Sequence, residues 1–294
     1  MLVLGFPDYP AQSRALAAAL GVPCEFVDLH RFPDGESRLR LPENLPSRVV
    51  LCRTLDQPNG KLVELMLAAG GARAQGAEHL TLVAPYLCYM RQDKAFMPGE
   101  VVSQQIIGRF LADYFDAVVT VDPHLHRVSS LAEAVPAEQA VVLSAAPAMG
   151  RFLASRNQRP LLVGPDEESE QWVRTVAGVA GLDYVIARKV RRGDQSVEVT
   201  LPERDYAGLQ VVLVDDLAST GRTLAQATRA LKAAGAARVD ALVTHALFVA
   251  DALQIMEAAG VGEIWSSDSV PHPTNAFSLA NELAEAVTLT EQVH

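Results

Sequence analysis

VVLVDDLASTGRT, residues 211–223, joins an apolar run to a segment of helical periodicity and carries two adjacent carboxylates between them. An unbroken apolar run of this kind is typical of a strand covered on both faces, and a helix that follows it directly is typical of a parallel α/β sheet. Ligands bind to such sheets at the carboxyl ends of the strands. Asp215 and Asp216 are therefore placed where a ligand site is expected.

Six further apolar runs of strand length are spread along the chain and alternate with helical segments, so the sequence predicts an α/β fold with mainly parallel sheets flanked by helices. These runs are residues 48–52, 79–84, 117–121, 160–163, 184–187 and 238–244, beside the strand at 210–215. Helices are predicted over 101–115, over 223–234 with Gly235 as its C-terminal cap, and over 276–287.

The length of 294 residues suggests about two domains, at roughly 150 residues each. The stretches that begin at Thr81 and Leu161 share an outline, an apolar strand that ends in proline and then a polar loop. We therefore expect two similar domains, 1–145 and 146–294.

The composition narrows the classes of function. The chain has 49% hydrophobic and 20% charged residues, which argues against disorder, and a net charge of −10, which argues against non-specific binding to nucleic acid or anionic membrane. A phosphate-bearing ligand must be held by local cations, amides or a metal ion. The three cysteines have no metal-site spacing and are expected to be free thiols. The start lacks signal-peptide features and no apolar run reaches about 18 residues, so we expect a cytoplasmic protein.

The loop after Asp215 and Asp216 has the composition of a phosphate site. Hydroxyl groups and backbone amides at a helix N-terminus bind phosphate, and the two carboxylates are suited to accept hydrogen bonds from vicinal sugar hydroxyls. The donors are Ser219, Thr220, Gly221 and Thr223. An ordinary strand–helix turn, with Asp, Ser and Thr as caps, is the alternative.

Four other polar segments follow predicted strands or turns. They are RQDK with Arg91 and Gln92, VDPHLHR with His124 and His126, GPDEE with Asp166, and FPDGE with Phe32, Asp34 and Glu36. Arginine suits polyphosphate, and a histidine with an aspartate suits magnesium that keeps phosphate and water ligands. Read one at a time, these segments are ordinarily a solvated loop, hydrogen-bonded strand ends and a Pro/Asp/Gly turn.

RKVRRGDQSVEV, from Arg188, carries four cations within five residues. Taken alone, it is a solvated hairpin tip. Positive charge of this density also suits the stabilisation of a transferring phosphoryl group.

The 211–223 string resembles the phosphoribosyl-pyrophosphate motif shared by type I phosphoribosyltransferases and ribose-phosphate pyrophosphokinases. PYLCYMRQDKAFMPGE and VDPHLHR resemble the ribose-phosphate pyrophosphokinases, and the order of segments agrees from about residue 30 to residue 275. The resemblance implies two domains of phosphoribosyltransferase type. It also implies magnesium-dependent transfer of pyrophosphate from ATP to the anomeric hydroxyl of ribose 5-phosphate, with AMP as the second product.

The resemblance assigns roles by position. In the ribose 5-phosphate site, Asp215 and Asp216 would hold the ribose hydroxyls, and Ser219, Thr220, Gly221, Arg222 and Thr223 would hold the 5-phosphate. Lys189 and Arg191 match a catalytic Lys-x-Arg loop.

On the ATP side, Arg91 and Gln92 would bind ATP, His124 would contact Mg2+ and the nucleotide phosphates, and Asp166 would lie near the metal. Phe32, Asp34 and Glu36 would form an adenine pocket for a neighbouring subunit, which makes a homo-oligomer part of the site.

Two other functions remain open at this point. A non-catalytic regulatory homologue would bind nucleotide without turnover, although Lys189, Arg191, His124 and Asp166 are all in place. A phosphoribosyltransferase would explain residues 211–223 and leave the first half of the chain without a role.

Overall fold

The computed structural model describes residues 1–125, 128, 130–192 and 196–291. Within them the chain divides into two compact units. Unit 1 is Met1–Leu143 with Leu279–His294, and unit 2 is Ser144–Ser278.

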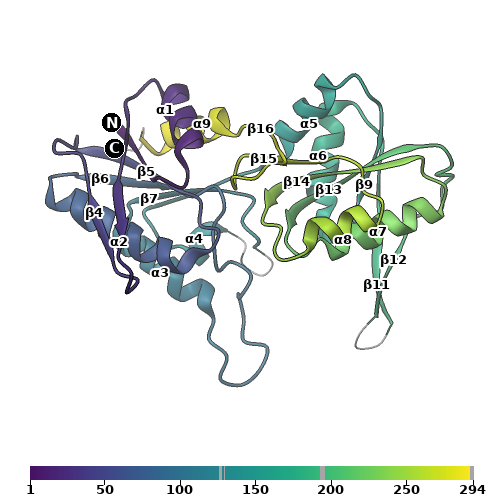
Figure 1. Cartoon of the computed structure of the whole chain (residues 1–294), viewed down its shortest axis with the longest axis horizontal. Coiled ribbons are helices and arrows are strands. Elements are labelled where there is room, and N and C mark those ends of the chain that lie inside the picture. The colour runs from purple at the N-terminus through teal and green to yellow at the C-terminus, as the bar shows by residue number, and fades with distance from the viewer. Residues whose placement is uncertain (126–127, 129, 193–195, 292–294) are drawn as a thin grey trace. The chain divides into compact units, whose positions relative to one another are not determined.

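In the described part of unit 1, six parallel strands form one sheet in the order β2-β1-β5-β6-β7-β8. The strands are β1 (Leu2–Gly5), β2 (Cys24–Phe26), β5 (Arg48–Cys52), β6 (His79–Val83), β7 (Ala117–Val121) and β8 (Gln139–Leu143). Figure 1 shows α1 (Pro10–Leu20) and α9 (Ala280–Glu291) on one face, and α2 (Pro58–Ala74) and α3 (Ser103–Tyr114) on the other. A hairpin of β3 (Asp28–Arg31) and β4 (Ser37–Arg40) follows β2, and α4 (Leu131–Ala134) precedes β8.

Unit 2 repeats this plan, with six parallel strands among its described residues in the order β10-β9-β13-β14-β15-β16. The strands are β9 (Leu161–Gly164), β10 (Tyr184–Ile186), β13 (Gln210–Ala218), β14 (Arg238–Ala246), β15 (Ile264–Ser267) and β16 (Asn275–Phe277). α5 (Ala146–Ser155) and α6 (Glu170–Ala180) cover one face, and α7 (Arg222–Ala233) and α8 (Ala252–Ala258) cover the other (Figure 1). The hairpin here is β11 (Arg188–Arg192) with β12 (Ser196–Thr200), and a 3-10 turn, η1 (Glu167–Ser169), precedes α6.

The two units therefore share one strand order, and each has its hairpin between the second and third sheet strands along the chain. This confirms the predicted pair of similar α/β halves. The equivalence proposed from the stretches at Thr81 and Leu161 is wrong, because β6 is fourth in its sheet and β9 is second. The topological counterpart of β9 is β1, and GFPD at 5–8 corresponds to GPD at 164–166.

Every predicted strand and helix is present; β5 and β7 have the predicted ends, and the ends of the others are shifted. The C-terminal helix starts at Ala280 rather than at 276, because Asn275–Phe277 pairs with β15 as the edge strand β16. This helix also belongs to unit 1 and not to the second domain, whose predicted range was 146–294. It buries Leu283 and Val287, and the side-chain amide of Gln139 donates to the Thr290 carbonyl at 3.0 Å.

Each sheet is packed against its helices by aliphatic side chains. In unit 1, Leu65 of α2 and Leu111 of α3 share a core with Leu51 and Leu82 of the strands. All three cysteines are free thiols, as predicted, and burial raises the pKa of Cys88 to about 12. None of the described helices combines the length and apolar character needed to cross a bilayer.

Candidate functional site at the carboxyl edges of the sheets

Strand β13 carries Asp215 and Asp216 to the carboxyl edge of the sheet in unit 2. The strand continues to Ala218, three residues beyond its predicted end, because Leu217 and Ala218 still pair with β14. The Asp216 amide donates to Oδ1 of Asp215 at 3.0 Å. Burial, together with the nearby carboxylates of Asp216 and Asp166, raises the pKa of Asp215 well above its ordinary value. Three carboxyl groups are therefore crowded at this edge of the sheet.

The loop that follows β13 is short and fixed. Residues 219–221 connect β13 to α7, which begins at Arg222, so the amides of this loop lie at a helix N-terminus. Gly221 has a φ of +68°, and a Cβ atom there would lie 2.9 Å from Cγ of Met256 and 3.0 Å from the Ala252 carbonyl oxygen. Only glycine fits this position without displacing α8. The side chain of Arg222 is exposed.

Residues 247–249, which were not predicted as part of the site, hold this loop in place. The amides of Leu247 and Phe248 donate to the Ala218 carbonyl at 3.1 and 2.9 Å, and the Val249 amide donates to the Ser219 carbonyl at 3.0 Å. Phe248 and Ala250 have positive φ angles of 28° and 53°. Such backbone strain in non-glycine residues persists only where the surroundings enforce it.

Asp166 and Lys189 meet at the same edge of unit 2. Asp166 follows β9 and accepts a hydrogen bond from the Ser169 amide at 3.2 Å through Oδ1, which caps η1. Its Oδ2 accepts from the Nζ ammonium of Lys189 on β11. Arg191 lies on the same strand, and its side chain is outside the described part of the structure. Unit 2 thus brings Asp166, Lys189, Asp215 and Asp216 into one electrostatic cluster.

In unit 1, the loop with Arg91 and Gln92 is attached to the start of α3. Gln104 is fully buried, its side-chain amide donates to the Met90 carbonyl at 3.2 Å, and its backbone amide donates to the Gln92 carbonyl at 3.2 Å. The side chain of Arg91 is exposed at the start of this loop. Gln104 was not predicted from the sequence, because a glutamine in an amphipathic helix is normally solvated.

His124 lies just after β7, at the carboxyl edge of the unit 1 sheet, and is half-buried. Two residues earlier, the buried Asp122 has a φ of 38°, and its amide donates to the Leu143 carbonyl at 2.8 Å. His126 lies outside the described residues.

The FPDGE segment forms the tight turn of the β3–β4 hairpin. The Phe32 amide donates to the Glu36 carbonyl at 2.8 Å, and Oδ1 of Asp34 accepts from the Glu36 amide at 3.1 Å. The ring of Phe32 is 41% exposed and meets His30 edge-on at 4.7 Å. The turn was predicted from its Pro, Asp and Gly residues, and the structure confirms it.

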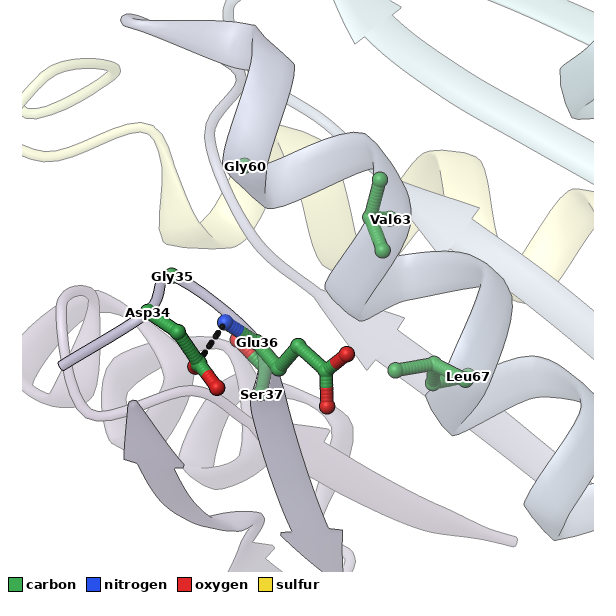
Figure 2. A pocket seen from close by; sticks show the side chains of 7 residues that line it. All are labelled: Asp34, Gly35, Glu36, Ser37, Gly60, Val63 and Leu67. Atoms are coloured by element: carbon green, nitrogen blue, oxygen red, sulfur yellow. Dashed lines mark hydrogen bonds between the residues drawn. The ribbon is translucent and has the colours of Figure 1, made fainter. Parts of the chain in front are cut away.

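A cavity of about 530 Å³ lies between this turn and α2. Figure 2 shows the Glu36 side chain reaching from the turn toward Leu67 on the helix, with Val63 one turn earlier. The cavity is lined by Asp34, Gly35, Glu36, Ser37, Gly60, Val63 and Leu67. Two carboxylates on one side and exposed aliphatic groups on the other suit a flat ligand that carries N–H donors.

The predicted residues are divided between the units: Phe32, Asp34, Glu36, Arg91, Gln92 and His124 belong to unit 1, and the others belong to unit 2. Among the described residues, no group of three or more His, Cys, Asp or Glu side chains forms a metal cage of its own. A metal at either edge would need ligand or water oxygens to complete its coordination.

Comparison with known proteins covers both units. Residues 1–114 match the family described as the N-terminal domain of ribose phosphate pyrophosphokinase, and residues 134–251 match the phosphoribosyl transferase domain. The ribose-phosphate pyrophosphokinase of Methanopyrus kandleri is 38% identical over 98% of each chain, and that of Methanosarcina acetivorans is 32% identical over 98% of this chain and 99% of its own.

Among solved structures, the phosphoribosylpyrophosphate synthetase of Mycobacterium smegmatis aligns with a TM-score of 0.83 over 100% of this chain and 99% of its own, at 22% identity, which supports the fold. The sequence similarity extends over both units at more than 30% identity, and the chain belongs to the ribose-phosphate pyrophosphokinase family.

Proposed function

We propose that this chain is an active ribose-phosphate pyrophosphokinase. It transfers the β,γ-pyrophosphate of ATP to the anomeric hydroxyl of ribose 5-phosphate and produces phosphoribosyl pyrophosphate and AMP, which supplies nucleotide, histidine and tryptophan biosynthesis. The observation that carries this proposal is the full-length similarity to enzymes of that name, which spans both units. A phosphoribosyltransferase would require the second half alone, and residues 1–114 match a domain described for the pyrophosphokinase.

The ribose 5-phosphate site is assigned to unit 2. The 219–223 loop offers amides and hydroxyls to the 5-phosphate, and the helix dipole of α7 adds positive potential there. Asp215 and Asp216 accept hydrogen bonds from the ribose hydroxyls. These contacts lower the cost of the crowded carboxylates, because hydrogen bonds from hydroxyl donors favour the ionised form of a carboxyl group.

ATP binding is assigned to unit 1, with Arg91, Gln92 and His124 at the phosphates and sugar. The cavity beside α2 supports an adenine site, since Asp34 and Glu36 can accept from the exocyclic amino group while Val63 and Leu67 contact the ring. Phe32, Asp34 and Glu36 would serve the nucleotide of a neighbouring subunit. The proposed enzyme is therefore a homo-oligomer. We also propose that it acts in the cytoplasm.

Magnesium fits the donors of this site. Asp166 provides a hard carboxylate oxygen that already has a cation, the Lys189 ammonium, beside it, and the carboxylates around Asp215 leave an excess of negative charge. Asp166 in unit 2 and His124 in unit 1 are each proposed as a ligand of Mg2+ beside substrate oxygens, in keeping with the preference of this ion for few protein ligands. When bound, the ion neutralises charge on the nucleotide phosphates.

Lys189 and Arg191 are assigned to catalysis through charge. The anomeric oxygen attacks the β-phosphorus, and the bond to the bridging oxygen of AMP breaks. A protein nucleophile is not needed, so the chain contributes positioning and positive charge on the transferring group. The β11–β12 hairpin brings Lys189 beside Asp166, at the edge where Asp215 lies, and Arg191 is two residues further along β11.

The proposal is tested by measuring AMP formation from ATP and Mg2+ with and without ribose 5-phosphate. The wild-type protein is expected to release AMP only when the sugar phosphate is present. The double variant Asp215→Asn, Asp216→Asn is expected to lose this activity and to bind ribose 5-phosphate more weakly in calorimetry. AMP release that is independent of the sugar, or an unchanged affinity in the double variant, contradicts the assignment.

A further inference from the structure

Both ends of the turn that carries Phe32, Asp34 and Glu36 are attached to one carboxylate on α2. At the start of the turn, Arg31 donates to Glu64 twice, from Nε to Oε1 at 2.7 Å and from Nη2 to Oε2 at 3.1 Å. At its end, Oγ of Ser37 donates to Oε1 of the same carboxylate at 3.2 Å. Glu64 therefore closes the base of the turn.

Glu64 is itself held from inside unit 1 by a buried cation. Arg53, with a side chain 0% exposed, donates from Nη2 to Oε2 of Glu64 at 2.6 Å, and the Glu64 side chain is 1% exposed. Arg53 also pairs with Asp8 at 3.1 Å, and its guanidinium lies 4.2 Å from the centre of the Phe6 ring. These contacts leave the Glu64 carboxylate little freedom to move.

Arg53 occupies the position in the unit 1 sheet that Asp215 occupies in the unit 2 sheet. Arg53 directly follows Cys52, the residue paired with Gly5 at the end of β1. In unit 2, Leu213 pairs with Val163, and β9 ends one residue later at Gly164. Asp215 lies two residues after Leu213. Both residues thus stand one step past the end of the neighbouring strand. Where unit 2 presents a carboxylate for a ligand, unit 1 has a buried arginine that is fully engaged within the protein.

The charge states agree with this geometry. Burial alone would raise the pKa of Glu64, but the hydrogen bonds from Arg31 and Arg53 outweigh it and hold that pKa below its ordinary value. Glu64 stays ionised and the attachment persists near neutral pH.

We propose that Glu64 is a positioning residue for nucleotide binding, which fixes the turn 32–36 through Arg31 and Ser37. This inference rests on the proposed function, because it assumes that the turn binds adenine. Leu29 and Leu39 pack against the core lower in the hairpin, so the ion pair acts on the turn rather than on the fold of the hairpin. Loss of the attachment should weaken ATP binding and leave the ribose 5-phosphate site, which is assigned to unit 2, unaffected.

Arg31→Ala is the main test, since it cuts the attachment at its exposed end and leaves the buried pair between Arg53 and Glu64 in place. Arg40→Ala is the matched control, because Arg40 lies on the same hairpin and pairs with the exposed Asp28 at 3.0 Å. We expect Arg31→Ala to raise KM for ATP about tenfold, with kcat and KM for ribose 5-phosphate within roughly twofold of wild type. Arg40→Ala should leave all three constants unchanged, and Glu64→Gln should raise KM for ATP as Arg31→Ala does.

Two further measurements separate the possible failures. Amide exchange at Phe32 and Gly35, whose N–H groups close the turn, should accelerate in Arg31→Ala. Phe32→Ala tests the underlying assignment: if it leaves KM for ATP unchanged, the turn does not bind adenine and the proposed function of the turn fails with it. If Phe32→Ala raises KM for ATP while Arg31→Ala changes neither KM nor exchange, Glu64 has no positioning role. An equal rise in both KM values would also overturn the proposal, because it indicates general destabilisation.

Discussion

Replacement of Lys189 by alanine is expected to lower kcat about 100- to 1,000-fold while affinity for ribose 5-phosphate is maintained. That range is what the loss of one positioned transition-state donor costs, about 2.7–4 kcal/mol. In the proposed mechanism, Lys189 acts on charge that develops on the transferring phosphoryl group, whereas the 219–223 loop and the two adjacent carboxylates of β13 are proposed to bind the sugar phosphate.

The structure separates this kinetic effect from a loss of folding. In the unliganded chain, Lys189 contacts Asp166, and the lysine side chain is 37% exposed. Because the lysine end of the pair is open to solvent while Asp166 is 12% exposed, we expect the pair to contribute about 1 kcal/mol to the free energy of unfolding. For a chain of this size such a change moves the thermal midpoint by only about 2–4 °C. A 100-fold fall in kcat at 25 °C cannot arise from that loss.

The assay measures initial rates of AMP formation at saturating ATP and ribose 5-phosphate, with calorimetry of ribose 5-phosphate binding in parallel. Arg188→Ala is the matched control, because Arg188 precedes Lys189 on β11, is 78% exposed and lies 3.5 Å from the exposed Glu167. The control should keep kcat within roughly twofold of wild type. A kcat in Lys189→Ala that is close to wild type would remove Lys189 from the mechanism, and a loss of ribose 5-phosphate affinity would make it a binding residue.

Three more outcomes follow from particular contacts. Asp215→Asn should stabilise the unliganded protein by about 0.5–2 kcal/mol at pH 7 in denaturant titrations. The raised pKa of Asp215 in the wild type means that the folded chain binds this proton more tightly than the unfolded chain does. The wild-type free energy of unfolding therefore falls as pH rises from 3.8 through the raised pKa, and the variant should lack this slope. Gly60→Leu should raise KM for ATP, because a Cβ atom at Gly60 meets open space at the cavity beside α2, whereas Gly70→Leu on the same helix should not. Gly108→Ala should lower the free energy of unfolding by at least about 1–3 kcal/mol in thermal denaturation, since its Cβ atom would lie 1.6 Å from the Ala134 carbonyl oxygen.

Although β1 and β15 were missed, most central strands could be predicted from the sequence because parallel strands covered on both faces must be apolar throughout. Arg48–Cys52 and Arg238–Ala246 are examples, with nearly every residue buried. Short edge strands carry a weaker signal: Tyr184–Ile186 was predicted, whereas Cys24–Phe26 and Asn275–Phe277, also three residues long and partly exposed, were not. The same weakness explains why the final helix was expected four residues too early and in the wrong unit.

The part of the site that lies on one continuous segment could be predicted from the sequence. Asp215 and Asp216, with the loop after them, form a continuous motif, and the structure places that motif at a strand end and a helix start. Arg53 was not predictable, because a charged residue after an apolar strand is normally assumed to be solvated. Its burial depends on Asp8 and Glu64, which are 45 and 11 residues away in the chain and meet it only in the folded unit.

Phosphorus NMR of the purified protein with ATP, Mg2+ and ribose 5-phosphate tests pyrophosphoryl transfer most directly. We expect AMP and phosphoribosyl pyrophosphate to appear in equal amounts as ATP disappears. ADP with a singly phosphorylated sugar would mean transfer of one phosphoryl group and would contradict the proposed reaction. Absence of turnover in a sample that binds both substrates would contradict it as well, and would favour a regulatory homologue.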